Sequence, residues 1–167
     1  MPGQLEPEQL KSDLILPKVV QGIMLTLLAA YIIVCLIFGD QIQQPLPEGQ
    51  RVLIRTILYI VAIATLPLTN LLRFIQLRLN QTMPYSNAAP RLEAKKRYLV
   101  TIILSMSLIE SVGIFGFVMF ILGDNLNTLF IFSGIAALGL FLYRPKVNEY
   151  AAIVEALTTE EKMNAGK

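Results

Sequence analysis

Apolar residues occur along this chain in four long runs that contain almost no charged residues. The runs extend over roughly Val19 to Phe38, Val52 to Leu72, Tyr98 to Leu122 and Thr128 to Tyr143. A helix needs about 17 to 25 apolar residues to cross the hydrocarbon core of a bilayer, at a rise of about 1.5 Å per residue. The first three runs meet this length, and the fourth is near the lower limit. Because backbone polar groups in lipid must be bonded within the span, the pattern predicts an all-α membrane protein with four transmembrane helices.

Polar segments surround these runs and set the domain organisation. The N-terminal arm is acidic and contains proline, and it lacks the basic leader and cleavage site of a secretory signal, so we expect the first run to be retained. Residues 80–90, N-Q-T-M-P-Y-S-N-A-A-P, should interrupt the second and third helices. In the tail, V-N-E-Y-A-A-I-V-E-A-L from Val147 allows a short amphipathic helix. The chain thus divides into an arm (1–18), a four-helix domain (19–143) with a central loop (73–97), and a tail (144–167).

Composition narrows the chemistry that the chain can perform. Hydrophobic residues make up 54% of its 167 residues and charged ones only 16%, which exceeds the usual apolar content of a soluble domain. There is no histidine, so the commonest general base and metal ligand is missing. The single cysteine, Cys35, lies in the first apolar run and has no partner for a disulfide or a cysteine metal site. We therefore expect neither an enzyme nor a protein with a metal centre or an organic cofactor.

Lysine and arginine are distributed unevenly among the polar segments. They precede the first run, fill the central loop and follow the fourth run, whereas only Arg51 and Arg55 fall on the other side. By the positive-inside rule, both termini and the central loop are cytoplasmic, and residues 39–50 and 123–127 lie outside. We expect the cytoplasmic (inner) membrane of a prokaryote. The asymmetry already explains the basic clusters, and the net charge of +2 says little about partners, so no nucleic-acid partner is implied. Residues 91–97 are expected to anchor the chain near lipid head groups, and Arg55 to snorkel outward.

Two short stretches suggest an internal repeat. L-I-F-G-D, from Leu36 to Asp40, matches F-I-L-G-D, from Phe120 to Asp124. The alignment places Thr26 over Glu110, and Arg73 corresponds to Arg144 if the longer first external loop is treated as an insertion. Either a helical hairpin is used twice in parallel orientation, or the similarity arises by chance between apolar helices.

Glu110 is a carboxylate in the middle of the third apolar run. A charge at the bilayer centre costs about 2.5 to 3.5 kcal/mol on insertion scales, so this residue should face other helices and be protonated, ion-bound or paired. At about 100° per residue, Ser107 and Ser111 lie on one flank of the glutamate. Gly113 and Gly116 lie on the other, where another helix can approach closely. The pattern favours a pocket for a proton or a small cation such as Na⁺.

The run from Glu110 to Leu122, E-S-V-G-I-F-G-F-V-M-F-I-L, resembles the carboxylate helix of the rotor-ring c subunits of rotary ATP synthases, especially the sodium-binding ones. In that family the glutamate binds the translocated proton or sodium ion and the adjoining serine contributes to the site. The resemblance implies these roles for Glu110 and Ser111. It covers this helix alone: the preceding helix has no closely spaced glycine ladder, and a long loop replaces the family's short polar turn.

Three functional classes remain open from the sequence. In the first, Glu110 binds a proton or Na⁺ within an oligomer or a larger complex. In the second, the chain is a non-catalytic structural or assembly subunit, and Glu110 packs helices by hydrogen bonding to Ser107, Asn70, Thr69 or another chain. The third is a small transporter, which requires oligomerisation because four short helices enclose no solute pathway. The expected partners are the lipid bilayer and either further copies or other membrane subunits. Pro67 should kink the second helix.

Overall fold

A computed structural model describes residues 7–83 and 89–165, and in these ranges every regular element is an α-helix. The all-α prediction is therefore confirmed. Residues 1–6 of the arm, 84–88 of the predicted loop and 166–167 of the tail lie outside the described residues. The helices of the described part are α1 (Pro7–Asp13), α2 (Ile15–Ile42), α3 (Glu48–Thr82), α4 (Pro90–Ile121), α5 (Leu126–Leu142) and α6 (Val147–Ala165).

Local sequence explains where several of these helices begin and end. Pro90 starts α4 in the first turn, where a missing N–H costs nothing. Asn125 caps α5 by accepting a hydrogen bond from the backbone N–H of Thr128. Between these two helices Gly123 has a φ of 87°, and a Cβ there would lie 2.6 Å from the backbone of Pro45.

α3 runs unbroken through Pro67. α6 extends beyond the short helix predicted in the tail.

The lengths of the helices bear on the predicted number of spans. α2, α3 and α4 are long and apolar enough to cross a membrane. α5 has 17 residues and is not long enough to count as a span alone. It qualifies only together with α6, and the chain bends by 46° between these two helices. The structure therefore contains three helices of spanning length, or four spans if the bent pair is counted as one.

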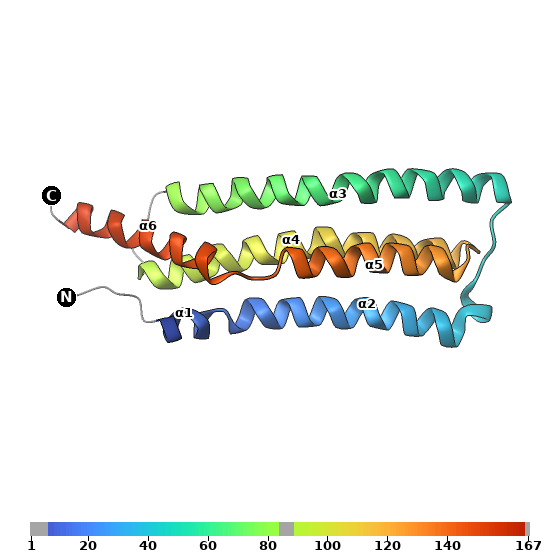
Figure 1. Cartoon of the computed structure of the whole chain (residues 1–167), viewed down its shortest axis with the longest axis horizontal. Helices are drawn as coiled ribbons and strands as arrows, with labels where there is room; N and C mark the ends of the chain where they lie inside the picture. The colour runs from blue at the N-terminus through green and yellow to red at the C-terminus, as the bar shows by residue number, and fades with distance from the viewer. Residues whose placement is uncertain (1–6, 84–88, 166–167) are drawn as a thin grey trace.

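α4 lies at the centre of the molecule (Figure 1). It packs against α2, α3, α5 and α6, whereas α2 and α3 lie on opposite sides of the α4–α5 pair and make no extensive contact with each other. Half of the most apolar stretch of α4 is buried, compared with 11% in α2 and 17% in α3. The two hairpins proposed as a repeat are thus packed differently: α4–α5 is a close pair, and α2–α3 is held apart by it.

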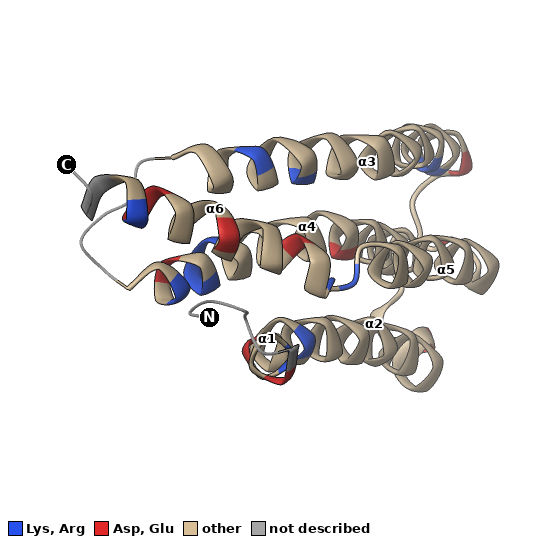
Figure 2. Cartoon of the chain, turned by 60° about the vertical axis from the view of Figure 1, so that its left-hand side comes forward, with Lys and Arg blue, Asp and Glu red and all other residues tan. Residues whose placement is uncertain are grey.

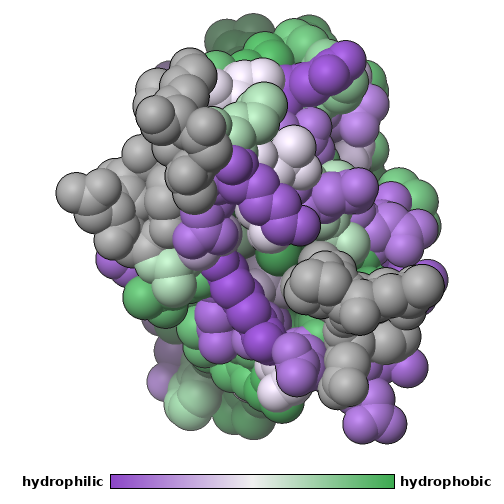
Figure 3. Space-filling view, turned by 90° about the vertical axis from the view of Figure 1, so that its left-hand side faces the viewer, coloured by the Kyte–Doolittle hydropathy of each residue, from purple (hydrophilic) through white to green (hydrophobic). Residues whose placement is uncertain are grey.

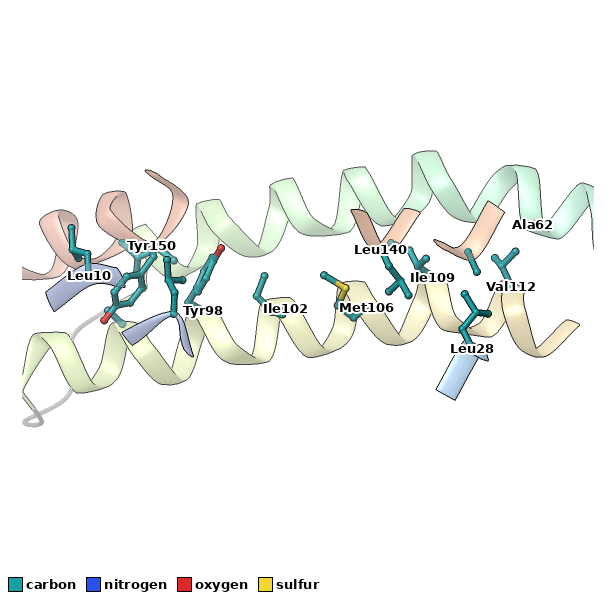
Figure 4. Close-up of a cluster of buried hydrophobic side chains, with 14 of the residues drawn as sticks. Leu10, Leu28, Ala62, Tyr98, Ile102, Met106, Ile109, Val112, Leu140 and Tyr150 are labelled. Carbon is teal, nitrogen blue, oxygen red and sulfur yellow. The ribbon is translucent and has the colours of Figure 1, made fainter. Parts of the chain in front are cut away.

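The core follows the inner face of α4. Ile109 and Val112 are fully buried there, and Leu28, Ala62 and Leu140 approach them from three other helices (Figure 4). Two glycines allow this close approach. A Cβ on Gly113 would lie 2.4 Å from Leu28 of α2, and one on Gly116 would lie 2.8 Å from Phe132 of α5. α4 is thereby fixed in register against both neighbours.

Charged side chains gather at the two ends of the molecule (Figure 2). Most lie at the end formed by α1, α6 and the adjoining ends of the long helices, which we call the α6 end. A smaller group lies at the opposite end, around residues 43–51 and 122–125, which we call the turn end. There Arg51 donates to the carbonyl of Gly123 at 2.9 Å, and Arg55 pairs with Asp124 at 3.3 Å. Arg55 thus reaches Asp124 at the turn end, with one-third of its side chain exposed, and its outward direction in a membrane stays a prediction.

Candidate functional site around Glu110

Glu110 is buried in the apolar middle of α4, with 4% of its surface exposed. Neither oxygen of its carboxyl group has a hydrogen-bond partner among the described residues. Buried polar side-chain atoms are bonded in the large majority of cases, so two unpartnered oxygens on one group are unusual. An ionised carboxylate in this position would carry the full cost of desolvation with no compensating contact.

The two serines that the sequence places beside Glu110 do not hydrogen-bond to it. Ser107 is exposed on the outer side of α4. The hydroxyl of Ser111 donates to the carbonyl of Leu108 at 2.6 Å, within its own helix. Glu110 therefore lies at the border between the buried face of α4 and an exposed strip that carries Ser107, about 60° further round the helix.

The candidate partners on α3 are also separate from the carboxyl group. Thr69 is buried, but its hydroxyl donates to the carbonyl of Thr65 at 2.7 Å. Asn70 and Pro67, the other residues of α3 considered for helix packing, are exposed, and a packing role for them stays a prediction. A hydrogen bond from α3 that would hold Glu110 in place is absent among the described residues.

Tyr31 of α2 is the polar neighbour that sequence reasoning missed. It lies on the face of α2 that packs against α4, where its ring packs on Phe117 with centroids 5.4 Å apart, and its hydroxyl makes no hydrogen bond to Glu110. The carboxyl group and the phenol thus both belong to the packing of α2 against α4 without being bonded to each other. The parallel course of these helices was predictable from the topology, but their register was not, because it depends on the contact of Leu28 with Gly113.

This arrangement suits a proton better than a metal ion. Hard cations take several oxygen ligands. Among the described residues, no group of three or more acidic, cysteine or histidine side chains is assembled around Glu110 or elsewhere. The hydroxyl of Ser111 retains lone pairs, but its proton is directed to Leu108. A complete Na⁺ shell would need oxygens from another molecule.

A second polar cluster, at the α6 end, links four helices. Arg73 of α3 has a side chain only 5% exposed and donates to Tyr143 O at 2.6 Å and to the carboxylate of Glu149 at 2.6 Å. The hydroxyl of Tyr98 on α4 donates to the same carboxylate and accepts the backbone N–H of Lys146 at 2.8 Å. This cluster joins α3 and α4 to the turn between α5 and α6.

α1 is attached to the same end through Asp13. This carboxylate accepts hydrogen bonds from Arg91 at 2.7 Å and from the hydroxyl of Tyr150 at 2.9 Å, and Lys95 lies 3.6 Å away. Burial alone would raise the pKa of Asp13, but these hydrogen bonds and positive charges outweigh it and hold the pKa below its usual value. Arg91 and Lys95 are thus engaged within the chain, but about two-fifths of each side chain is exposed, and the lipid anchor expected of residues 91–97 stays a prediction.

Similarity to known proteins adds no assignment to either cluster. Comparison with protein-family models, with curated proteins and with solved structures finds no match.

Proposed function

We propose that the protein is an integral membrane subunit that crosses the bilayer four times, with α5 as the fourth span. α5 is apolar throughout and is followed at once by Arg144. The bend of 46° after it allows α6, which carries charged residues along its length, to leave the membrane. In this arrangement the α6 end, with its many basic residues, is cytoplasmic by the positive-inside rule, and both termini lie on that side.

Within this subunit, Glu110 is proposed to carry a proton that it exchanges as part of its function. The observation that carries this proposal is the burial of both carboxyl oxygens without a hydrogen-bond partner. A neutral carboxylic acid is tolerated in such a place at much lower cost than a carboxylate, and ionisable residues inside membranes commonly mark proton or ion pathways. The resemblance of the helix to the carboxylate helix of rotor-ring c subunits is consistent with this role.

The proposed proton exchange takes place in an oligomer or a larger complex. Glu110 borders the exposed strip of α4, and most of the apolar surface of α2 and α3 is not covered by the chain itself. A neighbouring molecule seated along that strip would bring polar groups to Glu110 from outside. Na⁺ is the less favoured ligand, because it would require most of its oxygen ligands from that neighbour.

A structural or assembly subunit is the second candidate function. It is favoured by the polar clusters at the α6 end, where Arg73, Glu149 and Asp13 hold α1 and α6 in fixed positions. Such a surface would present α1 and α6 to a cytoplasmic partner. In that case Glu110 would donate a permanent hydrogen bond to a neighbouring chain and would exchange no proton during function.

Labelling with a hydrophobic carbodiimide separates the two candidates, since the reagent attacks protonated carboxyl groups in apolar surroundings. The protein is treated in native membranes over a pH series, and each carboxyl group is quantified by peptide mass spectrometry. Glu110→Gln is the blank, and exposed Glu155 on α6, outside the apolar surroundings that the reagent needs, is the control for non-selective labelling. Labelling of Glu110 that declines as the pH rises supports an exchangeable proton, and suppression by Na⁺ but not K⁺ would identify the ion as sodium. Absence of labelling at every pH, together with loss of a co-purifying partner in Glu110→Gln, would contradict the proton-exchange role.

A further inference from the structure

A hollow of about 430 Å³ lies at the α6 end, where α2 begins and the α5–α6 turn passes close to it. Its polar rim consists of Lys18, Arg144, Lys146 and Asn148, and Leu14 and Pro145 form a buried floor. Among the described residues, no acidic side chain lines it. In Figure 3, which faces this end, hydrophilic residues cross the middle of the surface and hydrophobic ones surround them.

The three cations of this hollow differ from the two arginines at the turn end. Lys18, Arg144 and Lys146 are exposed, and none of their side chains makes an ion pair or a hydrogen bond within the described residues. At the turn end, by contrast, Arg51 and Arg55 are bonded to Gly123 and Asp124. The hollow therefore holds positive charge that the chain itself does not neutralise.

The backbone of the α5–α6 turn, which carries Arg144 and Lys146, is held in place by hydrogen bonds from α3 and α4. Arg73 donates to the carbonyl of Arg144 at 3.3 Å, and Tyr98 bonds to both the carbonyl and the N–H of Lys146. Pro145 between them is buried and has a restricted φ. A turn fixed in this way loses little conformational entropy when its side chains bind a ligand, which increases affinity.

The position of the hollow indicates what kind of anion it meets. Lys18 precedes the long apolar part of α2, and Arg144 comes directly after the apolar α5. In the membrane arrangement proposed above, these residues lie at the level of lipid head groups on the cytoplasmic side. Basic pockets in this place bind anionic head groups, and about 1 kcal/mol is gained for each basic side chain near an anionic surface.

We propose that this hollow binds the phosphodiester group of an anionic phospholipid, with Lys18, Arg144 and Lys146 around the phosphate and the glycerol above Leu14 and Pro145. The volume is within the usual range of small-molecule sites, about 300 to 1,000 Å³. The inference requires the membrane arrangement, but it is independent of any role of Glu110.

Native mass spectrometry of the purified full-length protein tests the site. The protein in mild detergent is titrated with phosphatidylglycerol and, separately, with phosphatidylcholine, and the triple variant Lys18→Gln, Arg144→Gln, Lys146→Gln is compared with the wild type. The control triple Arg78→Gln, Lys96→Gln, Lys162→Gln removes the same charge from residues outside the hollow. Inorganic phosphate and glycerol 3-phosphate are added as competitors.

Preferential binding of phosphatidylglycerol should be weakened roughly 100-fold in the site variant and changed little in the control, given about 1 kcal/mol for each cation removed. Equal loss in both triples would overturn the proposal, because it would show only a general charge effect. Displacement of the lipid by millimolar inorganic phosphate would also overturn it, in favour of a free-anion site. If the triple variant does not fold, the single variants Lys18→Gln and Arg144→Gln must each show a several-fold loss. Glu110→Gln should keep the lipid preference, so failure of the proton role and failure of this site can be told apart.

Discussion

Replacement of Arg73 by methionine tests whether the polar cluster at the α6 end holds the helices together. The side chain of Arg73 is 5% exposed and bonds to three groups: Tyr143 O at 2.6 Å, Arg144 O at 3.3 Å and the Glu149 carboxylate at 2.6 Å. Methionine keeps the apolar length of the side chain and removes all three donors. The change therefore reports the loss of hydrogen bonds and charge more than the loss of packing.

The magnitude follows from what Arg73→Met leaves behind. Removal of one partner of a buried ion pair typically costs about 3 to 5 kcal/mol, because an unpaired charge remains. Here the remaining charge, on Glu149, is 20% exposed and still accepts a hydrogen bond from Tyr98. We therefore expect the free energy of unfolding to fall by about 2 to 3 kcal/mol.

The free energy of unfolding is measured in mixed micelles by titration with a denaturing detergent, with helix content followed by circular dichroism. Hydrogen exchange of the α6 amides is measured in parallel, because α6 is released first if the cluster holds it. The matched control is Arg78→Met, on the exposed side of the same helix, with an expected loss of less than about 0.5 kcal/mol. The double variant Arg73→Met, Glu149→Gln should recover part of the loss, since no orphan charge remains. A loss in Arg73→Met no greater than in the control would refute the reasoning.

Three further predictions concern other contacts of the chain. Gly116→Ala should destabilise the protein by about 1 to 3 kcal/mol, because its Cβ would lie 2.8 Å from an α5 side chain, whereas Gly134→Ala, with nothing within 4 Å, should be neutral by the same titration. Asp13→Asn should increase hydrogen exchange in α1 at neutral pH. In the wild type, whose Asp13 pKa is lowered, this protection persists down to about pH 3.8 and is lost only as the pH falls further through the folded-state pKa. Asp124→Asn should cost only about 0.5 to 1 kcal/mol of unfolding free energy, because its partner is one-third exposed.

The sequence predicted the helical class, the apolar runs and the burial of Glu110, because each depends on local pattern alone. The close approach at Gly113 and Gly116 also follows from residue type, since only glycine leaves such space at the helix surface. The N-terminal arm was less predictable. No helix was predicted there, yet α1 forms, and Asp13 at its end bonds to Arg91 and Tyr150 on two other helices.

The partners of the polar groups could not be read from the sequence. The ion pair of Arg55 depends on the place of Asp124, which is far away in the sequence and close in the fold. The serines beside Glu110 share its helix, but one hydroxyl is bonded to a backbone carbonyl and the other side chain is exposed. Tyr31 carries no motif that marks it as a neighbour of the carboxyl group. These features depend on the helix register, which is set by packing between distant segments.

The separation of α2 and α3 by the α4–α5 pair has a consequence for the order in which the protein is built. Nearly all contacts of α2 and α3 are with segments synthesised later. In the proposed membrane arrangement, both helices therefore enter the bilayer before any of their packing partners exists, and each must persist in lipid as an independent span, which its internal backbone hydrogen bonds permit. Once α4 is synthesised, α2 and α3 can pack against opposite sides of it. Truncation before residue 90 would leave two stable but unassociated spans, and residues 90–167, nearly half of the chain, carry the information that joins them.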